Sequence, residues 1–163
     1  VATALVSGAT SVSVGNLGAC ATTPTDPFCW GSNATGLLGT GPDGGTPPSG
    51  TPLDMNTLAS AVAISSANGH ACAILGDGSV TCWGLNDHGQ CGDGTTTDRT
   101  TPGTVAGITN AIAIAAGSAH TCAWARDGIY CWGDDSLGQL GDGRSSGDGG
   151  PLLSTTPVKI VIP

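Results

Sequence analysis

The chain has 163 residues, of which 28 are Gly, 10 are Pro and only 10% are charged. Gly, Pro, Thr and Asp disfavour helix interiors and favour turns, so helices are not expected, while a hydrophobic share of 39% excludes a disordered tail. The net charge is −8, the four basic residues are scattered and no long apolar run is present, so neither nucleic-acid binding nor membrane insertion is expected.

Three copies of one pattern follow each other along the chain. They cover residues 11–41, 61–94 and 111–143, and each begins with a short run in which apolar residues occupy every second position. Such alternation predicts a strand with one buried face. The apolar members of the three runs are Val12 and Val14, Val62 and Ile64, and Ile112 and Ile114.

A hairpin is predicted in the middle of each copy. A strand with a Cys-Ala pair comes first, then a turn, and then a strand with the triplet Cys-Trp-Gly. In the second and third copies the turn is Asp-Gly, a strong hairpin signal because Gly accepts a positive φ, whereas the first copy lacks this pair. The three tryptophans of the triplets are 53 and 49 residues apart, so the unit is about fifty residues long; they are Trp30, Trp83 and Trp132.

A glycine-rich loop ends each copy, and a Thr-Pro pair is predicted to open the unit that follows. Gly-x-x-Gly ends the motif, and Thr51-Pro52, Thr101-Pro102 and Thr156-Pro157 are each predicted to open a further short strand. With four strands per copy, blade 1 is expected at about 1–50, blade 2 at about 51–100 and blade 3 at about 101–155 of a single domain, 1–163. Residues 156–163 are then an extra opening strand, available for assembly; its expected contact residues are Thr156, Pro157, Val158, Ile160 and Ile162.

The combined motif resembles the regulator of chromosome condensation repeat, in the cysteine-bearing form of secreted bacterial proteins. It is carried most closely by His120–Ala123, Cys131–Gly133 and Gly138–Gly143, while the first copy departs from it by lacking the His. The resemblance implies an all-β fold of propeller blades, each with about four antiparallel strands. Propellers of this family usually have seven blades, so three blades imply an incomplete propeller that other subunits complete or extend.

Six of the seven cysteines form three pairs, nine or ten residues apart, with one pair on each predicted hairpin. The two positions of a pair can lie opposite each other on neighbouring strands, so three disulfides and an extracellular or cell-surface location are expected. A metal site is the alternative, although metal ligands usually converge from two places rather than recur once per repeat. The pairs are Cys20–Cys29, Cys72–Cys82 and Cys122–Cys131.

Several single features remain open. Cys91 replaces a Leu of the other copies and is interpreted as a small buried residue, or as a free thiol or intermolecular disulfide. Asn33-Ala34-Thr35 fits the N-glycosylation pattern. Turn chemistry accounts for the Asp-Gly pairs at 93–94, 142–143 and 148–149, with a weak calcium site as the alternative, although the chain has no Glu to close a calcium loop. No other cofactor is expected.

No Ser-His-Asp set or phosphate-binding glycine loop is recognisable, and His70 and His120 recur at one repeat position, which favours structural hydrogen bonds over catalysis. The chain is therefore expected not to be an enzyme. We expect a secreted structural subunit that self-associates, as a ring or as a surface filament or sheath. The alternatives are a fragment of a longer propeller, or a module that binds other extracellular proteins through residues 41–58, 93–103 and 142–156.

Overall fold

Three four-stranded antiparallel sheets form the protein, in a computed structural model that describes residues 6–41, 47–144 and 152–160. Each sheet is called a blade below. Blade 1 contains β1 (Ser11–Val14), β2 (Gly18–Thr22), β3 (Pro27–Gly31) and β4 (Ser49–Asp54); blade 2 contains β5 (Ala61–Ala67), β6 (His70–Leu75), β7 (Val80–Gly84) and β8 (Arg99–Thr104); blade 3 contains β9 (Ala111–Ala116), β10 (His120–Ala125), β11 (Gly128–Asp134) and β12 (Leu153–Lys159). A short 3-10 helix, Asn56–Leu58, links blades 1 and 2.

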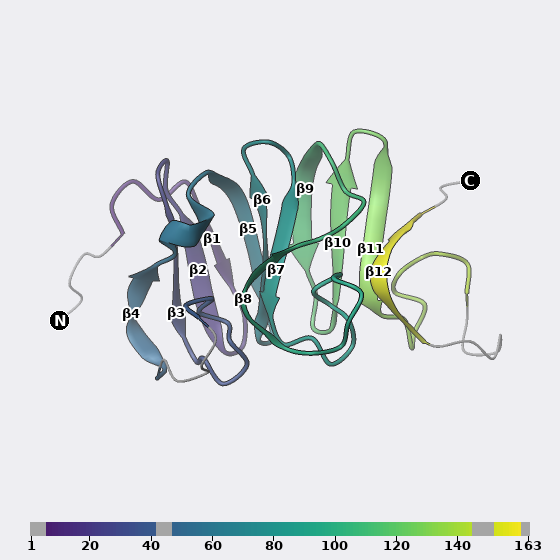
Figure 1. The fold of residues 1–163 in the computed structure, drawn as a ribbon, viewed down its shortest axis with the longest axis horizontal. Helices are drawn as coiled ribbons and strands as arrows, with labels where there is room; N and C mark the ends of the chain where they lie inside the picture. Colours follow the sequence, from purple (N-terminus) through teal and green to yellow (C-terminus); the bar gives the residue numbers. More distant parts are fainter. Residues whose placement is uncertain (1–5, 42–46, 145–151, 161–163) are drawn as a thin grey trace.

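The blades stand side by side along the long axis of the molecule (Figure 1). Strands within a blade are ordered as in the sequence, and the first strands β1, β5 and β9 contact each other from blade to blade. The fourth strands make no comparable contact, so the blades approach each other most closely at their first strands. This is the arrangement of blades in a propeller, as expected from the repeat.

The predicted hairpins form with the predicted pairing of cysteines. In each blade the second and third strands place the two cysteines directly opposite each other, with their Cα atoms 4.1 Å apart. All three disulfides are therefore confirmed. In blade 2 the turn is stabilised by Asp77, whose Oδ1 accepts hydrogen bonds from the backbone and hydroxyl of Ser79. Blade 1, which lacks Asp-Gly, uses Thr23 instead, which bonds to Asp26.

The sequence-based blade boundaries need correction. The Thr-Pro pairs lie in β4, β8 and β12, which are the last strands of the three blades and not the first strands of the next ones. The expected boundaries near 50, 100 and 155 therefore fall inside strands. Each of these edge strands bulges opposite the tryptophan of the third strand, and proline is tolerated there because its missing N–H breaks no ladder hydrogen bond.

The prediction of an extra opening strand at 156–163 is wrong for the same reason. β12 pairs with β11 and completes blade 3, so Thr156, Pro157 and Val158 belong to that blade. Ile160 follows the strand, and its N–H donates to the carbonyl of Ile129. Ile162 lies outside the described residues.

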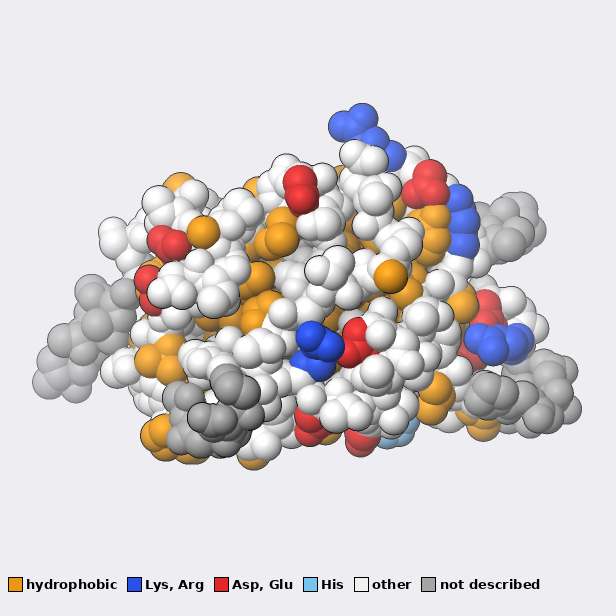
Figure 2. Space-filling view, viewed as in Figure 1, with side chains coloured by type: hydrophobic (Ala, Val, Ile, Leu, Met, Phe, Trp, Pro, Cys, Tyr) orange, Lys and Arg blue, Asp and Glu red, His pale blue; other side chains and the backbone are white. Residues whose placement is uncertain are grey.

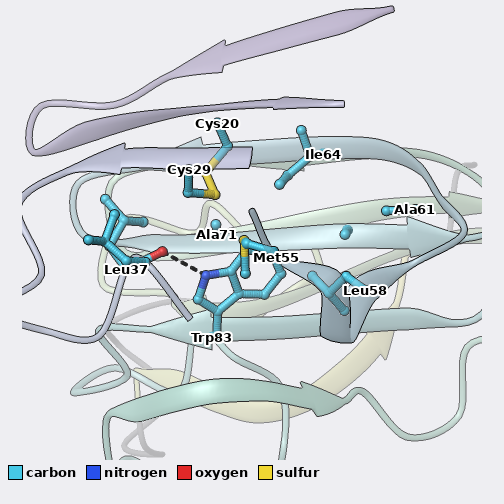
Figure 3. Close-up of a cluster of buried hydrophobic side chains, with 11 residues drawn as sticks. Cys20, Cys29, Leu37, Met55, Leu58, Ala61, Ile64, Ala71 and Trp83 are labelled. Atoms are coloured by element: carbon cyan, nitrogen blue, oxygen red, sulfur yellow. Dashed lines mark hydrogen bonds between the residues drawn. A yellow bond between two sulfur atoms is a disulfide. The ribbon is translucent and has the colours of Figure 1, made fainter. Parts of the chain in front are cut away.

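The hydrophobic core lies between the blades and not within any one of them. Figure 3 shows the first cluster, in which Cys20, Cys29, Leu37 and Met55 of blade 1 face Trp83, Ile64 and Ala71 of blade 2. A second cluster joins blades 2 and 3 in the same way, around Trp132. Each blade is therefore stabilised by the face of its neighbour, as in other repeat proteins.

Candidate functional site

The same indole hydrogen bond recurs at both interfaces between blades. The indole Nε1 of Trp83 donates to the carbonyl of Leu37 in blade 1, and the Nε1 of Trp132 donates to the carbonyl of Gln90 in blade 2, both at 2.8 Å. Both tryptophans are completely buried. Both carbonyls belong to the Gly-x-x-Gly loop of the preceding blade, and Figure 3 shows the bond between Trp83 and Leu37.

The glycines of this loop allow the next blade to approach. A Cβ atom at Gly36 would lie 2.7 Å from the Cα of Thr100, and one at Gly89 would lie 2.8 Å from the Cα of Thr155. Two further backbone bonds join the loop to the same strands, from the N–H of Gly41 to the carbonyl of Thr100 and from that of Gly94 to the carbonyl of Thr155. The loop of one blade therefore binds the third and fourth strands of the next.

One side chain shapes this loop in each blade. The Oδ1 atoms of Asn33, Asn86 and Asp135 accept a hydrogen bond from the backbone N–H five residues later, at 2.9, 2.8 and 3.0 Å. All three side chains are buried. The prediction of a glycosylation site at Asn33 is therefore wrong: its amide oxygen holds the loop inside the folded protein, where an attached glycan has no room.

His70 is buried at the interface between blades 2 and 3. Its Nε2 lies 3.0 Å from the Oγ1 of Thr121, which also donates to the carbonyl of Gln90. Burial, together with the nearby charge of His120, lowers the pKa of His70 to about 4. Among the described atoms its Nδ1 has no hydrogen-bond partner. His70 is thus a neutral structural residue at neutral pH, as the sequence predicted.

Cys91 is also buried, at the position that Leu38 and Leu140 occupy in the other blades. Its Sγ lies 3.7 Å from the carbonyl of Leu85. Burial raises the pKa of the thiol to about 12, which suppresses the reactive thiolate. The structure therefore supports the interpretation as a small buried residue with a free thiol, and an intermolecular disulfide has no access to this sulfur.

Blade 3 presents the equivalent face without a neighbour among the described residues. Trp124 is 53% exposed, whereas its counterpart Ile74 in blade 2 is 2% exposed. Leu137, in the glycine loop, is 91% exposed. Cys122, Trp124 and Ile129 line one shallow apolar groove together with β9. Trp124 therefore lies on an open apolar face.

The opposite face of the molecule, on blade 1, also has no neighbouring blade among the described residues. Val12 is 63% exposed, while its counterpart Ile64 is 6% exposed against blade 1. Trp30 is partly exposed, in contrast to the buried Trp83 and Trp132. The repeat pattern of the sequence predicts which positions these residues occupy. The arrangement of the blades shows that this face of blade 1 has no neighbouring blade among the described residues.

The carboxylates of the described residues form no metal site. No group of three or more His, Cys or Asp side chains within 6–41, 47–144 and 152–160 is arranged to bind a metal ion. Asp93 bonds to Arg99 and Thr95, and Asp142 bonds to Arg144. Burial opposes ionisation of Asp93, but the bonds from Arg99 and Thr95 outweigh it and hold its pKa below the ordinary value. The pair at 148–149 lies outside the described residues.

A groove with a volume of about 360 Å³ lies between the short helix and the outer strands of blade 2. Its lining combines apolar side chains with hydroxyl groups and includes no ionisable side chain; it consists of Thr57, Leu58, Leu75, Ser79, Val80, Thr81, Thr101, Pro102 and Thr104. Such a lining offers contacts to a ligand or a protein, but no acid, base or strong nucleophile. Among the described residues, no helix is long and apolar enough to cross a membrane.

The second and third repeats are similar to a known family of repeats. A family model for the regulator of chromosome condensation (RCC1) repeat matches residues 77–124, and a second model of the same description matches residues 61–90 and 111–139. A secretion-regulating guanine nucleotide exchange factor of Bos taurus is 44% identical over 52 residues, which are 32% of this chain and 11% of that protein.

Two solved structures share the fold over nearly the whole chain. Prp20p of Saccharomyces cerevisiae, whose structure was described with its binding to Gsp1p and histones, superposes with a TM-score of 0.78 over 95% of this chain at 20% identity. Human WBSCR16 superposes with a TM-score of 0.79 over 96% of this chain at 19% identity. This chain spans 39% of the length of each. Residues 61–139, in the second and third repeats, are thus similar to RCC1 repeats, and all three repeats have the fold of RCC1-type propeller blades.

Proposed function

We propose that this chain is a non-enzymatic, extracellular subunit that self-associates through the open faces of its first and last blades. The observation that supports this proposal is that both faces are apolar and are equivalent to faces that are buried elsewhere in the same molecule. Val12 and Trp124 are largely exposed, whereas Ile64 and Ile74 are buried at the corresponding positions. Exposed apolar faces of this kind mark interaction sites.

The composition of the surface is consistent with this role. Figure 2 shows few charged side chains on the face it presents, scattered among uncharged and apolar ones. The groove beside the short helix provides no paired acid and base, and the buried titratable groups His70, Cys91 and Asp135 serve packing or hold a loop. These observations support binding rather than catalysis.

The three disulfides support a location outside the cell. Each closes a hairpin in which small residues, Ala or Thr, flank the first cysteine. Such bridges form and persist in oxidising compartments. The test is to express the chain with and without export and to count free thiols: one free thiol, that of Cys91, is expected in the exported protein.

The proposal is tested by the concentration dependence of the native mass. Light scattering and sedimentation of the chain over a wide concentration range are expected to show species larger than one chain, and electron microscopy distinguishes closed rings from filaments. A monodisperse monomer at all concentrations would exclude self-association.

A second candidate function is the binding of another extracellular protein through the loop regions 41–58, 93–103 and 142–156. The observation that favours it is the groove described above, because Thr57, Leu58, Thr101 and Pro102 of its lining belong to two of these regions. The relative Prp20p is a precedent for protein binding by this fold. Replacing Thr101 by Arg in this groove is expected to abolish capture of such a partner while leaving the native mass unchanged.

A further inference from the structure

The two open faces of the chain are complementary halves of the interface that joins its own blades. In this interface, the loop face of one blade meets the tryptophan face of the next. Among the described residues, no blade covers the loop face of blade 3 or the tryptophan face of blade 1. We infer that the self-association proposed above is head to tail: blade 3 of one copy binds blade 1 of a second copy.

The acceptor groups of the loop face are in place on blade 3. Gln139 corresponds to Leu37 and Gln90, whose carbonyls accept the indole hydrogen bonds within the chain. Gly143 corresponds to Gly41 and Gly94, whose N–H groups donate to the fourth strand of the next blade. Gly138 corresponds to Gly36 and Gly89, yet a Cβ at Gly138 meets no described atom within 4 Å.

The matching groups are in place on blade 1. Trp30 corresponds to Trp83 and Trp132, but its indole N–H donates to no described residue, and the side chain is partly exposed. Gly50 corresponds to Thr100 and Thr155, the residues that the loop face contacts, and a Cβ at Gly50 also meets nothing within 4 Å. Each of these groups on one face therefore has, on the other face, the equivalent of the group that it pairs with at the internal interfaces.

The apolar side chains of the two faces agree with this pairing. At the internal interfaces Ile74 and Val80 of one blade pack with Trp132, Ala123 and Ile114 of the next. Blade 3 offers Trp124 and Ile129 at the positions of Ile74 and Val80, and blade 1 offers Trp30, Ala21 and Val12 at the positions of the opposing residues. A second copy docked head to tail would remove these groups from water.

This geometry predicts an open-ended or ring-shaped assembly. Because the two contacting faces are different, each copy has one face of each kind, and addition of copies continues until the accumulated rotation closes a ring. Pairing of two blade 3 faces would instead give dimers only. The two arrangements are therefore separable by experiment.

The test uses one variant for each face. Trp124→Asp places a charge on the blade 3 face, and Val12→Asp places one on the blade 1 face; both side chains are more than half exposed, so the single chain should fold in both cases. Val62→Asp is the matched control, because Val62 is 61% exposed but belongs to the central blade. Intact disulfides and an unchanged thermal transition check folding.

Each face variant alone is expected to associate at least tenfold more weakly than the wild type, whereas the Val62→Asp control associates normally. A 1:1 mixture of the two face variants is expected to form one-to-one dimers and nothing larger, since one good face of each kind remains. Trp30→Phe, which removes the indole N–H together with part of the aromatic ring system, should weaken association about fivefold to tenfold.

The outcomes separate this inference, which rests on the proposed function, from that function itself. If the wild type never associates, both are wrong. If it associates but Val12→Asp assembles like the wild type while Trp124→Asp is monomeric, the contact joins two blade 3 faces and the head-to-tail inference is wrong. If both face variants assemble normally, self-association uses another surface.

Discussion

At the scale of single residues, the same side chain has different roles in different blades because its neighbours differ. Trp83 and Trp132 are buried interface anchors, while Trp30 occupies the same strand position and is partly exposed. Cys91, Leu38 and Leu140 occupy one buried position with different chemistry. A repeat sequence therefore defines the geometry of a residue, and the adjacent blade defines its environment.

His70 predicts a pH dependence of stability. Its pKa is 6.5 in the unfolded chain and about 4 in the folded one, so only the unfolded state gains a proton between these values. The contribution of His70 is therefore fully present above pH 6.5 and is lost as the pH falls towards 4. Between pH 7 and pH 5 the free energy of unfolding is expected to decrease by about 2 kcal/mol from this group alone.

The measurement is urea unfolding at pH 7 and pH 5 for the wild type and for His70→Gln, which cannot titrate. His88→Gln is the control, because His88 lies in an exposed pair with Asp87. The His70→Gln variant should lose clearly less stability on acidification than the wild type and the control. An equal loss in all three proteins would mean that His70 is not buried as described.

At the scale of the strands and loops, glycine and disulfides replace the large side chains that most hairpins use. β6 contains His, Ala, Cys, Ala, Ile and Leu, and is bridged to β7 by Cys72–Cys82. The glycine loops have positive φ values and lie against the next blade. These elements are short and rich in small residues, so cross-links and close backbone contacts provide much of their order.

Removal of one bridge tests this view. Replacing Cys72 and Cys82 together by Ala is expected to lower the free energy of unfolding by about 2–3 kcal/mol, because the bridge closes a loop of about ten residues in the unfolded chain. Urea unfolding in non-reducing buffer measures this loss. In the presence of a strong reductant the wild type should lose all three bridges and fall below the variant in oxidising buffer; unchanged stability on reduction would contradict the proposed cross-links.

The glycine loop gives a second prediction at this scale. Gly92 and Gly94 both have positive φ, but a Cβ at Gly92 would lie 2.7 Å from the indole nitrogen of Trp132, whereas one at Gly94 meets nothing within 4 Å. Gly94→Ala should cost about 1 kcal/mol for its backbone conformation alone. Gly92→Ala should cost about 1–3 kcal/mol more, since it also forces the blades apart. Equal costs in thermal or urea unfolding would argue against a tight loop contact.

At the scale of the whole molecule, the stability of each blade depends on how many of its faces are covered by another blade. The central blade is covered on both faces, and every residue of β7 is buried, whereas β1 and β12 are mostly exposed or partly exposed. In such an array each interface adds to stability, so the ends are weaker than the middle. Head-to-tail association would cover the end blades as well.

Hydrogen exchange tests this gradient. Amides of residues 70–84 are expected to exchange most slowly in the monomer, and those of β1 and β12 fastest, because the end strands open without disturbing the central blade. On association at high concentration, exchange in blades 1 and 3 should slow much more than in blade 2. Uniform exchange rates across the three blades of the monomer would show that it unfolds as one unit.

The sequence by itself determined the local structure: the three repeats, the hairpins and the cysteine pairs. These are set by short-range rules, since alternation defines a strand, Asp-Gly defines a turn, and two cysteines flanking a turn lie opposite each other. The strand containing Thr156-Pro157 was assigned to the wrong blade, because a Thr-Pro pair does not reveal on which side its pairing partner lies.

Only the tertiary structure decided which groups are free to interact. It moved Asn33 from a candidate glycosylation site to the interior, buried Cys91, and exposed Trp124, Leu137 and Val12 on two open faces. The physical reason is that the core of this protein lies between blades. Whether a side chain is buried therefore depends on a neighbour about fifty residues away, and no local pattern shows that the outer faces of blades 1 and 3 lack such a neighbour among the described residues.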